Sequence, residues 1–246
     1  MYKLWKRVIS LTLSLALLVP LAACGGGLSP DDATTYIQGI LDENYKGIYD
    51  AEFLEMIDST ETEAQEIYQN SIEVEADFLI GSLMDNAPTE EQRSELIELY
   101  KEIYAKASYT VDTATEIDET TYGVKVTVAP IDIFHQLMDE VSSGTTFTEF
   151  NAQYPDTMDD AQYYEYEIAW FQLVLDTLRE LIPSLGYLEE QSLVVQVTLG
   201  DDNYWSLNED DFNNLDWLHR LQFLSLHTRA RGLRRGLFFS LFGKFT

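Results

Sequence analysis

The chain has 246 residues and a formal net charge of −28, because 43 Asp and Glu side chains outnumber 15 Lys and Arg side chains. Such an acidic chain repels nucleic acid and anionic lipid headgroups, so we expect no nucleic-acid partner. A single Cys excludes an intramolecular disulfide framework. The length suffices for one large domain or two small ones.

The N-terminus has the pattern of an export signal. Three basic residues precede an apolar run over residues 8–23, which ends in small residues. A basic start, an apolar run of about 7–15 residues and a small-residue cut site are typical of a secretory signal peptide. A membrane-spanning helix needs about 20 predominantly apolar residues, and this run is shorter and interrupted by polar residues. The pattern therefore predicts a cleaved signal peptide over residues 1–23.

Cys24 directly follows this run and is followed by three glycines. The ending resembles a bacterial lipobox, which implies cleavage between Ala23 and Cys24 and acylation of Cys24, for example with palmitate. Two or three acyl chains meet the two-signal requirement for stable anchoring. We therefore predict that lipid on Cys24 anchors the protein in the cell membrane, with the body on the extracytoplasmic face. Residues 24–30 would form a flexible tether. A free thiol or an intermolecular bridge is the alternative for a lone exported Cys.

A break in composition separates the remaining chain into an acidic body, residues 31–217, and a basic tail, residues 218–246. Every Asp and Glu lies in the body, and the tail has none. The basic residues of the tail are Arg220, Arg229, Arg231, Arg234, Arg235 and Lys244. Such a break resembles translation in a shifted reading frame. As a genuine segment, the tail would suit an anionic membrane, the acidic body or nucleic acid.

Helical signals dominate the first half of the body. Ser29-Pro30-Asp31-Asp32 combines a capping residue, a first-turn Pro and acids at the positive helix end, and predicts a helix that Gly47 weakens or ends. A short helical continuation follows at residues 53–57. Capping-box spacing at residues 60–63 and 89–92 predicts two further helices, the first extending toward Met84.

From Ser108 the apolar period changes from about 3.6 to 2. Alternation over residues 109–115 and 124–128, with a turn at 118–121, predicts a β-hairpin that Pro130 ends. The remaining predicted elements are a helix at 131–141, loops at 142–144 and 155–160, a helix at 160–182, strands at 193–197 and 204–207, and a helix start at 206–209. Helices and strands occur in blocks, which predicts an α+β fold with helices packed on a curved antiparallel sheet.

The sequence contains no motif for nucleophilic, phosphate-binding or zinc chemistry. Oxygen ligands gather at residues 156–160, 201–203 and 208–211, but none of these clusters has EF-hand spacing, and turn and cap chemistry explains them. We therefore expect no catalytic residue, no cofactor and no metal site. Four aromatic residues suit either a sugar- or peptide-binding groove or the core: Tyr163, Tyr164, Tyr166 and Trp170.

Several segments together resemble a family. They are the lipobox with its glycines, the Ser-Pro-Asp-Asp helix start, the strand Tyr122–Pro130 and the segment Tyr204–Asn208 before an acidic helix. Residues 1–217 thereby resemble small, acidic, functionally uncharacterised lipoproteins of Gram-positive, Firmicutes-type gut bacteria. The resemblance implies a cystatin-like or NTF2-like body and an envelope location, and it assigns no functional residue.

Three functions stay open from the sequence. We favour a lipid-anchored extracytoplasmic binding or interaction module, which is not an enzyme and has an unknown protein or small-molecule partner. An envelope or polysaccharide hydrolase would need two close carboxylates in a cleft, one of them with a raised pKa. A purely structural envelope protein would have a filled core and no deep pocket.

Overall fold

A computed structural model describes residues 27–155, 157–201, 203–215 and 218. The predictions for the signal peptide, Ala23, Cys24 and nearly all of the basic tail fall outside these residues. The described chain divides into two compact units. Among the described residues, the sheet unit contains those within 27–74, 104–130 and 189–218, and the helical unit contains those within 75–103 and 131–188. The acidic body therefore contributes to both units.

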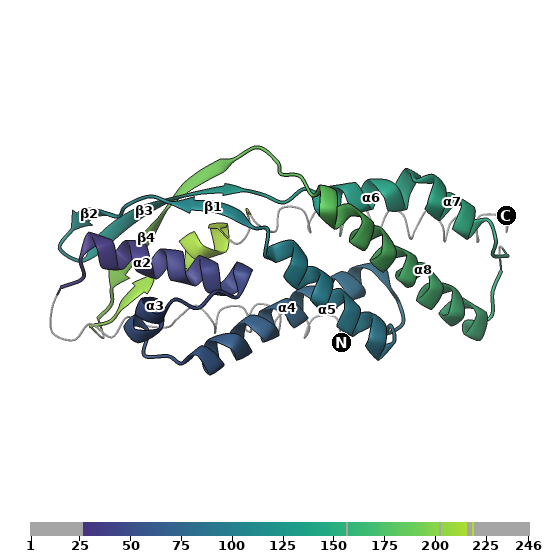
Figure 1. Ribbon diagram of the computed structural model, residues 1–246, viewed down its shortest axis with the longest axis horizontal. Coiled ribbons are helices and arrows are strands. Elements are labelled where there is room, and N and C mark those ends of the chain that lie inside the picture. The colour runs from purple at the N-terminus through teal and green to yellow at the C-terminus, as the bar shows by residue number, and fades with distance from the viewer. Residues whose placement is uncertain (1–26, 156, 202, 216–217, 219–246) are drawn as a thin grey trace, which may run out of the picture. The chain divides into compact units, whose positions relative to one another are not determined.

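The sheet unit confirms the α+β class. Its antiparallel strands are β1 (Ser108–Val111), β2 (Thr115–Asp118), β3 (Thr121–Ala129), β4 (Gln191–Leu199) and β5 (Trp205–Leu207). The strand order is β1-β3-β4-β5, and β2 also pairs with β3. The strands form a curved sheet (Figure 1). β3 alternates, with Tyr122, Val124, Val126 and Val128 buried. Alternate residues of a strand share one face, so this pattern fixes the face that meets the core.

The first strand of the predicted hairpin is interrupted, so a continuous strand over residues 109–115 is wrong. β1 ends at Val111 and β2 begins at Thr115, although both pair with β3. At the break the backbone N–H of Ala114 donates to the hydroxyl of Thr34, 2.9 Å away, instead of to a strand. Ala114 is buried there. A contact with a helix 80 residues earlier therefore takes the place of sheet pairing.

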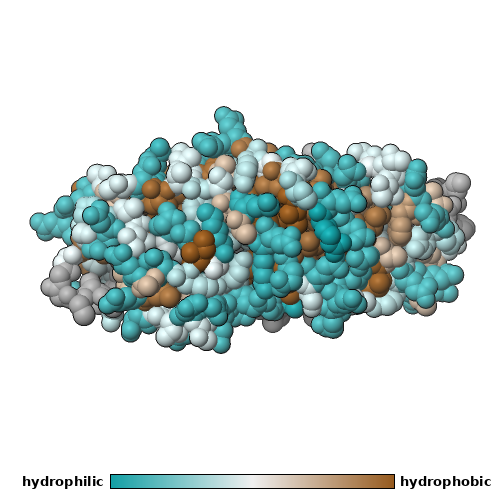
Figure 2. All heavy atoms as spheres, in the orientation of Figure 1, coloured by the Kyte–Doolittle hydropathy of each residue, from teal (hydrophilic) through white to brown (hydrophobic). Residues whose placement is uncertain are grey.

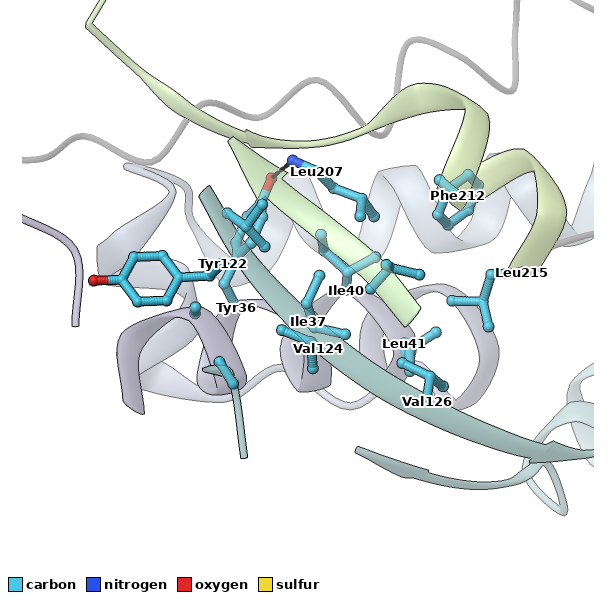
Figure 3. Packing of buried hydrophobic residues seen from close by; sticks show 14 of the residues in the cluster. Tyr36, Ile37, Ile40, Leu41, Tyr122, Val124, Val126, Leu207, Phe212 and Leu215 are labelled. Carbon is cyan, nitrogen blue, oxygen red and sulfur yellow. Dashed lines mark hydrogen bonds between the residues drawn. The ribbon is translucent and has the colours of Figure 1, made fainter. Parts of the chain in front are cut away.

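Helix α2 (Pro30–Leu41) packs its buried face into the core of the sheet unit, together with residues of the π-helical turn at 42–46, the short helix at 51–56 and the helix at 209–215. Its predicted start is confirmed, because Ser29 and Asp32 form a reciprocal capping box. Figure 3 shows the buried face of α2 against β3 and the C-terminal segment of this unit. The backbone N–H of Leu207 donates to the hydroxyl of Tyr36 at 3.4 Å, which gives this buried polar group a partner inside the core.

A π-helical turn, η1 (Asp42–Lys46), extends α2 before the chain turns back. Gly47 ends it with a φ of +60°, a left-handed conformation that glycine adopts without strain, as the sequence predicted. Helix α3 (Ala51–Met56) follows, with Asp50 accepting from two backbone N–H groups at its start. Helix α4 (Glu61–Leu83) begins in the sheet unit and ends in the helical unit, and Thr60 and Glu63 cap it as predicted.

The other helices are α5 (Glu90–Tyr104), α6 (Ile133–Ser143), α7 (Thr145–Asn151), α8 (Asp160–Leu181) and the 3-10 turn η2 (Ile182–Ser184). The predicted loop at residues 142–144 is wrong, because α6 continues through Ser143 and α7 follows after one extended residue, Gly144. Ser142 and Ser143 donate their hydroxyls to carbonyls four residues earlier and so remain within the helix. At the C-terminal side, Asn208 rather than Ser206 caps the helix at residues 209–215.

The contact between α2 and α3 yields a test of the core. A methyl group at Gly39 would overlap the ring of the buried Phe53. We expect Gly39→Ala to destabilise the fold by about 1–3 kcal/mol, although alanine favours helix more than glycine does. Urea unfolding followed by circular dichroism measures the change. Gly186→Ala is the control, because its methyl group would meet nothing closer than 3.9 Å. Equal stability of the two variants would contradict this packing.

Candidate functional site

An open depression of about 600 Å³ lies between α5 and α8 in the helical unit. Helical spacing brings its residues to the facing sides of these two helices, since residues three and four apart share one face. Residues from α5 and the position before it are Thr89, Glu91, Gln92 and Glu95. Residues from α8 are Tyr164, Glu165, Ile168, Ala169 and Gln172. The depression therefore combines carboxylates and amides with an aromatic ring and two apolar side chains.

Glu167 ties α8 to the turn before α5. Its carboxylate accepts hydrogen bonds from the backbone N–H of Asp85 at 2.7 Å and of Asn86 at 3.1 Å, and from the side-chain amide of Asn86 at 2.6 Å. Only 5% of the residue is exposed. A buried carboxylate is tolerated when several donors satisfy it. These bonds hold the start of α8 near the start of α5, where the depression lies.

Hydrogen bonds between the two helices fix the amides of the depression. The side-chain amide of Gln92 donates to the carbonyl of Ile168 at 2.8 Å and to the side-chain oxygen of Gln172 at 3.2 Å. Gln92 is also buried, which makes these bonds harder to replace with water. The polar groups of the depression are therefore held in place by the fold.

One carboxylate of the depression already holds a guanidinium. Arg179 of α8 forms an ion pair with Glu95 and a second one with Asp176 at 2.9 Å. Desolvation lowers the pKa of Arg179, but the hydrogen bonds and charges of Asp176 and Glu95 together outweigh it, so the pKa is raised. Glu95 therefore lies where a basic side chain can reach it.

The aromatic residues of α8 divide between the depression and the packing of the helices. Tyr164 lines the depression and is 43% exposed. Tyr166 instead packs with Phe150 and Tyr154, at ring-centroid distances of 5.8 and 4.9 Å, and Trp170 packs on Phe147 at 5.8 Å. Tyr163 donates its hydroxyl to Asp85. Of the four residues that the sequence singled out, only Tyr164 therefore lines the depression.

The π-helical turn of the sheet unit holds a second unusual carboxyl group. Glu43 is only 4% exposed, and burial raises its pKa to about 7 from the usual 4.5. Its neighbour Asp42 accepts a hydrogen bond from the hydroxyl of Tyr109 at 2.6 Å, and Lys46 lies 4.2 Å from the centre of the same ring. Burial and Asp42 together raise the pKa of Tyr109. Single π turns often occur at functional positions.

The predicted oxygen-rich clusters act as caps and ties where the structure describes them. Asp159 accepts from the backbone N–H of Gln162 at the start of α8, and Asp211 accepts from the backbone N–H of Gln196 in β4. Asp156 and Asp202 lie outside the described residues. In the described part of the chain, no group of three or more His, Cys, Asp or Glu side chains has a geometry that could hold a metal ion.

Comparison with known proteins gives one likeness, at the level of fold. No protein-family model matches the sequence, and no curated protein matches it. The chain is similar to the crystal structure of a "putative lipoprotein", ycdA, from Bacillus subtilis, with a TM-score of 0.51 and 18% identity. The match covers 76% of this chain and 55% of that one, so the chain spans about half the length of its structural relative. At this identity the likeness establishes a shared fold.

Among the described residues, no helix has the length and apolar character needed to cross a bilayer.

The ties of Glu167 lead to a first prediction for the site. Glu167→Gln replaces one accepting oxygen by a donor, so at least one of the donors of Asp85 and Asn86 loses its partner. We expect a loss of about 1–3 kcal/mol in the free energy of unfolding, the usual penalty for a buried donor left unsatisfied. Urea unfolding measures it. The control is Glu165→Gln, the same change two positions earlier on an exposed side chain. Its free energy of unfolding should stay within about 0.5 kcal/mol of wild type. An equal loss of stability in both variants would contradict the role of Glu167 as a hydrogen-bond acceptor.

The burial of Glu43 leads to a prediction about pH. Because the folded-state pKa is raised from 4.5 to about 7, the folded state binds more protons than the unfolded state between these values. The contribution of Glu43 to stability is therefore fully present below pH 4.5 and is lost as pH rises through about 7. The free energy of unfolding of Glu43→Gln should match that of wild type below pH 4.5 and exceed it by roughly 3 kcal/mol above pH 7.

Unfolding by urea across this pH range measures the difference. Glu52→Gln, a change of the same kind on an exposed side chain of α3, is the control and should run parallel to wild type. If the free energies of unfolding of wild type and Glu43→Gln differed by the same amount at all pH values, the pKa of Glu43 would be the same in the folded and unfolded states, which would contradict the prediction.

Proposed function

We propose that the chain is a lipid-anchored protein of the cell envelope, with its folded body on the extracytoplasmic face. The sequence around Cys24 supports this proposal, because a basic start, an apolar run and a lipobox-like ending occur in the expected order. The fold likeness to a protein described as a putative lipoprotein agrees with it. We also propose that the chain is related to the acidic lipoproteins of Firmicutes-type gut bacteria and has a cystatin-like or NTF2-like body.

We further propose that the body is a binding or interaction module. The observation that carries this role is the depression between α5 and α8, where fixed amides, carboxylates, an exposed tyrosine ring and apolar side chains converge. Binding sites combine an apolar lining with a few oriented polar groups, and this depression has both. The alternative role as a purely structural envelope protein receives no support from such a depression.

Binding accounts for this site better than hydrolysis does. A carboxylate-pair hydrolase needs its proton donor, with a raised pKa, in the cleft beside a second carboxylate. Glu43, whose pKa burial raises to about 7, does not line the depression and belongs to the sheet unit. We therefore propose a non-catalytic role for the depression.

Substitution of Cys24 tests the anchor. We expect Cys24→Ser to abolish fatty-acid labelling and cleavage before residue 24, because serine lacks the thiol that acylation requires. Metabolic labelling with an alkyne fatty acid, mass spectrometry of the N-terminus and membrane fractionation measure the effect. Gly26→Ser is the control, since it changes a tether residue and leaves the thiol in place. Continued labelling and cleavage at this point in Cys24→Ser would refute the lipoprotein proposal.

A further inference from the structure

We propose that the depression between α5 and α8 binds an organic cation with an apolar stem, as presented by the arginine side chains of a basic peptide. This inference rests on the binding role proposed above and names the chemistry of the ligand. It follows from three features of the same depression: its aromatic and apolar surface, its carboxylates and its occupied guanidinium contact.

The apolar features suit the stem of such a side chain. Tyr164 presents nearly half of its surface, and Ile168 and Ala169 lie one turn further along α8. A guanidinium group stacks on the face of an aromatic ring, and its methylene stem packs on apolar surface. A tyrosine ring beside two aliphatic side chains therefore offers contacts to both parts of an arginine side chain.

The carboxylates suit the charged end. Glu91 and Glu165 are exposed and lie on the two facing helices, while Glu95 is nearer to Gln172. A planar guanidinium binds carboxylates through paired hydrogen bonds and retains its charge in proteins. A cation gains an attraction to these exposed carboxylates that a neutral ligand does not, so the depression favours a cation over an uncharged sugar.

The contact between Arg179 and Glu95 shows the same recognition within the chain. Arg179, in the last turn of α8, pairs with Glu95, which lines the depression. Glu91 and Glu165 offer further carboxylates within the same depression. A ligand side chain that enters beside Tyr164 therefore finds a second site of the kind that Arg179 fills.

Hydrophilic side chains cover most of the face seen in Figure 2, and hydrophobic residues appear there in small separate groups. Because the chain carries 43 Asp and Glu side chains, general attraction of a cation to the acidic body is the competing explanation. The test must separate binding at one place from attraction to the whole body, which calls for substitutions that change charge equally inside and outside the depression.

The experiment measures binding of acetyl-Arg-Gly-Arg-amide to the full-length chain in a non-ionic detergent by isothermal titration calorimetry. The analogue with citrulline in place of arginine has nearly the same shape and no charge. We expect the citrulline peptide to bind at least about tenfold more weakly, because it lacks the charge that the carboxylates and the ring recognise. Equal affinity for the two peptides would overturn the proposal.

Substitutions then locate the site. We expect Glu91→Gln, Glu165→Gln and Tyr164→Ala each to weaken binding by about two- to fivefold, the range of a single exposed ion pair or cation–π contact. Arg179→Gln should strengthen it, because the substitution frees Glu95. The matched controls are Glu52→Gln and Glu55→Gln, exposed residues of α3, which should change affinity less than about twofold. Equal weakening by the controls would show attraction to the whole body and overturn the proposal.

Two further arms identify the source of the ligand and separate this inference from the proposed function. The first arm uses a full-length variant in which four arginines of the basic tail are changed to glutamine: Arg229, Arg231, Arg234 and Arg235. If the basic tail occupies the depression, this variant binds the peptide more tightly than wild type does. If the ligand is external, the two chains bind the peptide equally. Thermal unfolding with oligosaccharides and peptidoglycan fragments forms the second arm. Stabilisation by one of these without binding of the arginine peptide would overturn the cation inference and support a binding module, whereas a flat response to every probe would count against both.

Discussion

The antiparallel ladder between β3 and β4 is the constraint on which the chain topology depends. It joins Thr121 to Thr198 at one end and Val128 to Gln191 at the other, so two segments about 70 residues apart form neighbouring strands. The chain between them forms α6, α7 and α8. Its two ends are also tied to each other, through the bridge between Ile131 and Tyr187 and the hydrogen bond from Asp132 to Gly186 at 2.9 Å. Loop-closure entropy grows only slowly with length, so a sheet accepts such a long insertion at modest cost. The insertion supplies α8, which forms one wall of the depression, while α5, the other wall, comes from the chain before β1.

Two buried glutamates show how the same residue type serves different ends in this acidic chain. Glu167 accepts hydrogen bonds from three donors, so its burial fixes the turn before α5 and costs little. Glu43 is buried on a π turn, and desolvation alone is the cause of its raised pKa. Stability therefore depends on pH through Glu43, whereas Glu167 gives the depression its frame. The acidic composition of the sequence does not distinguish these two glutamates from the others, because most of the acidic residues are exposed.

The sequence predicted those features that depend on neighbouring residues. Capping at Ser29, Thr60 and Thr89 involves partners three positions away, and each cap is present. Alternation in β3 and β4 likewise identified the buried face, because strand periodicity is local. Two of the missed features depend on distant partners: the bond of Ala114 to Thr34 interrupts a strand 80 residues later, and Glu167 meets donors 81 and 82 residues away. The wrong loop at residues 142–144 is a local miss, because Ser142 and Ser143 bond to carbonyls four residues earlier and so stay in the helix. The depression, like the first two, depends on distant partners. Its Tyr164 was noticed as part of an aromatic group, but only the packing of α8 separates that residue from Tyr166 and Trp170.

The acidity of the body acquires a specific consequence when it is combined with a lipid anchor. An anionic membrane surface repels the carboxylates of the body, so membrane affinity would come from the acyl chains and the glycine tether would leave the body in the adjoining solution. The same surface attracts cations and raises their concentration within about one Debye length. With the proposed lipid anchor, the acidic body would meet basic peptides where they accumulate and would compete with the lipid headgroups for them. Headgroups supply charge alone, whereas the depression adds an aromatic ring and fixed amides at defined positions. Selectivity for an arginine side chain over a simple inorganic cation would then arise from these uncharged groups, while the surrounding carboxylates set how fast the ligand arrives.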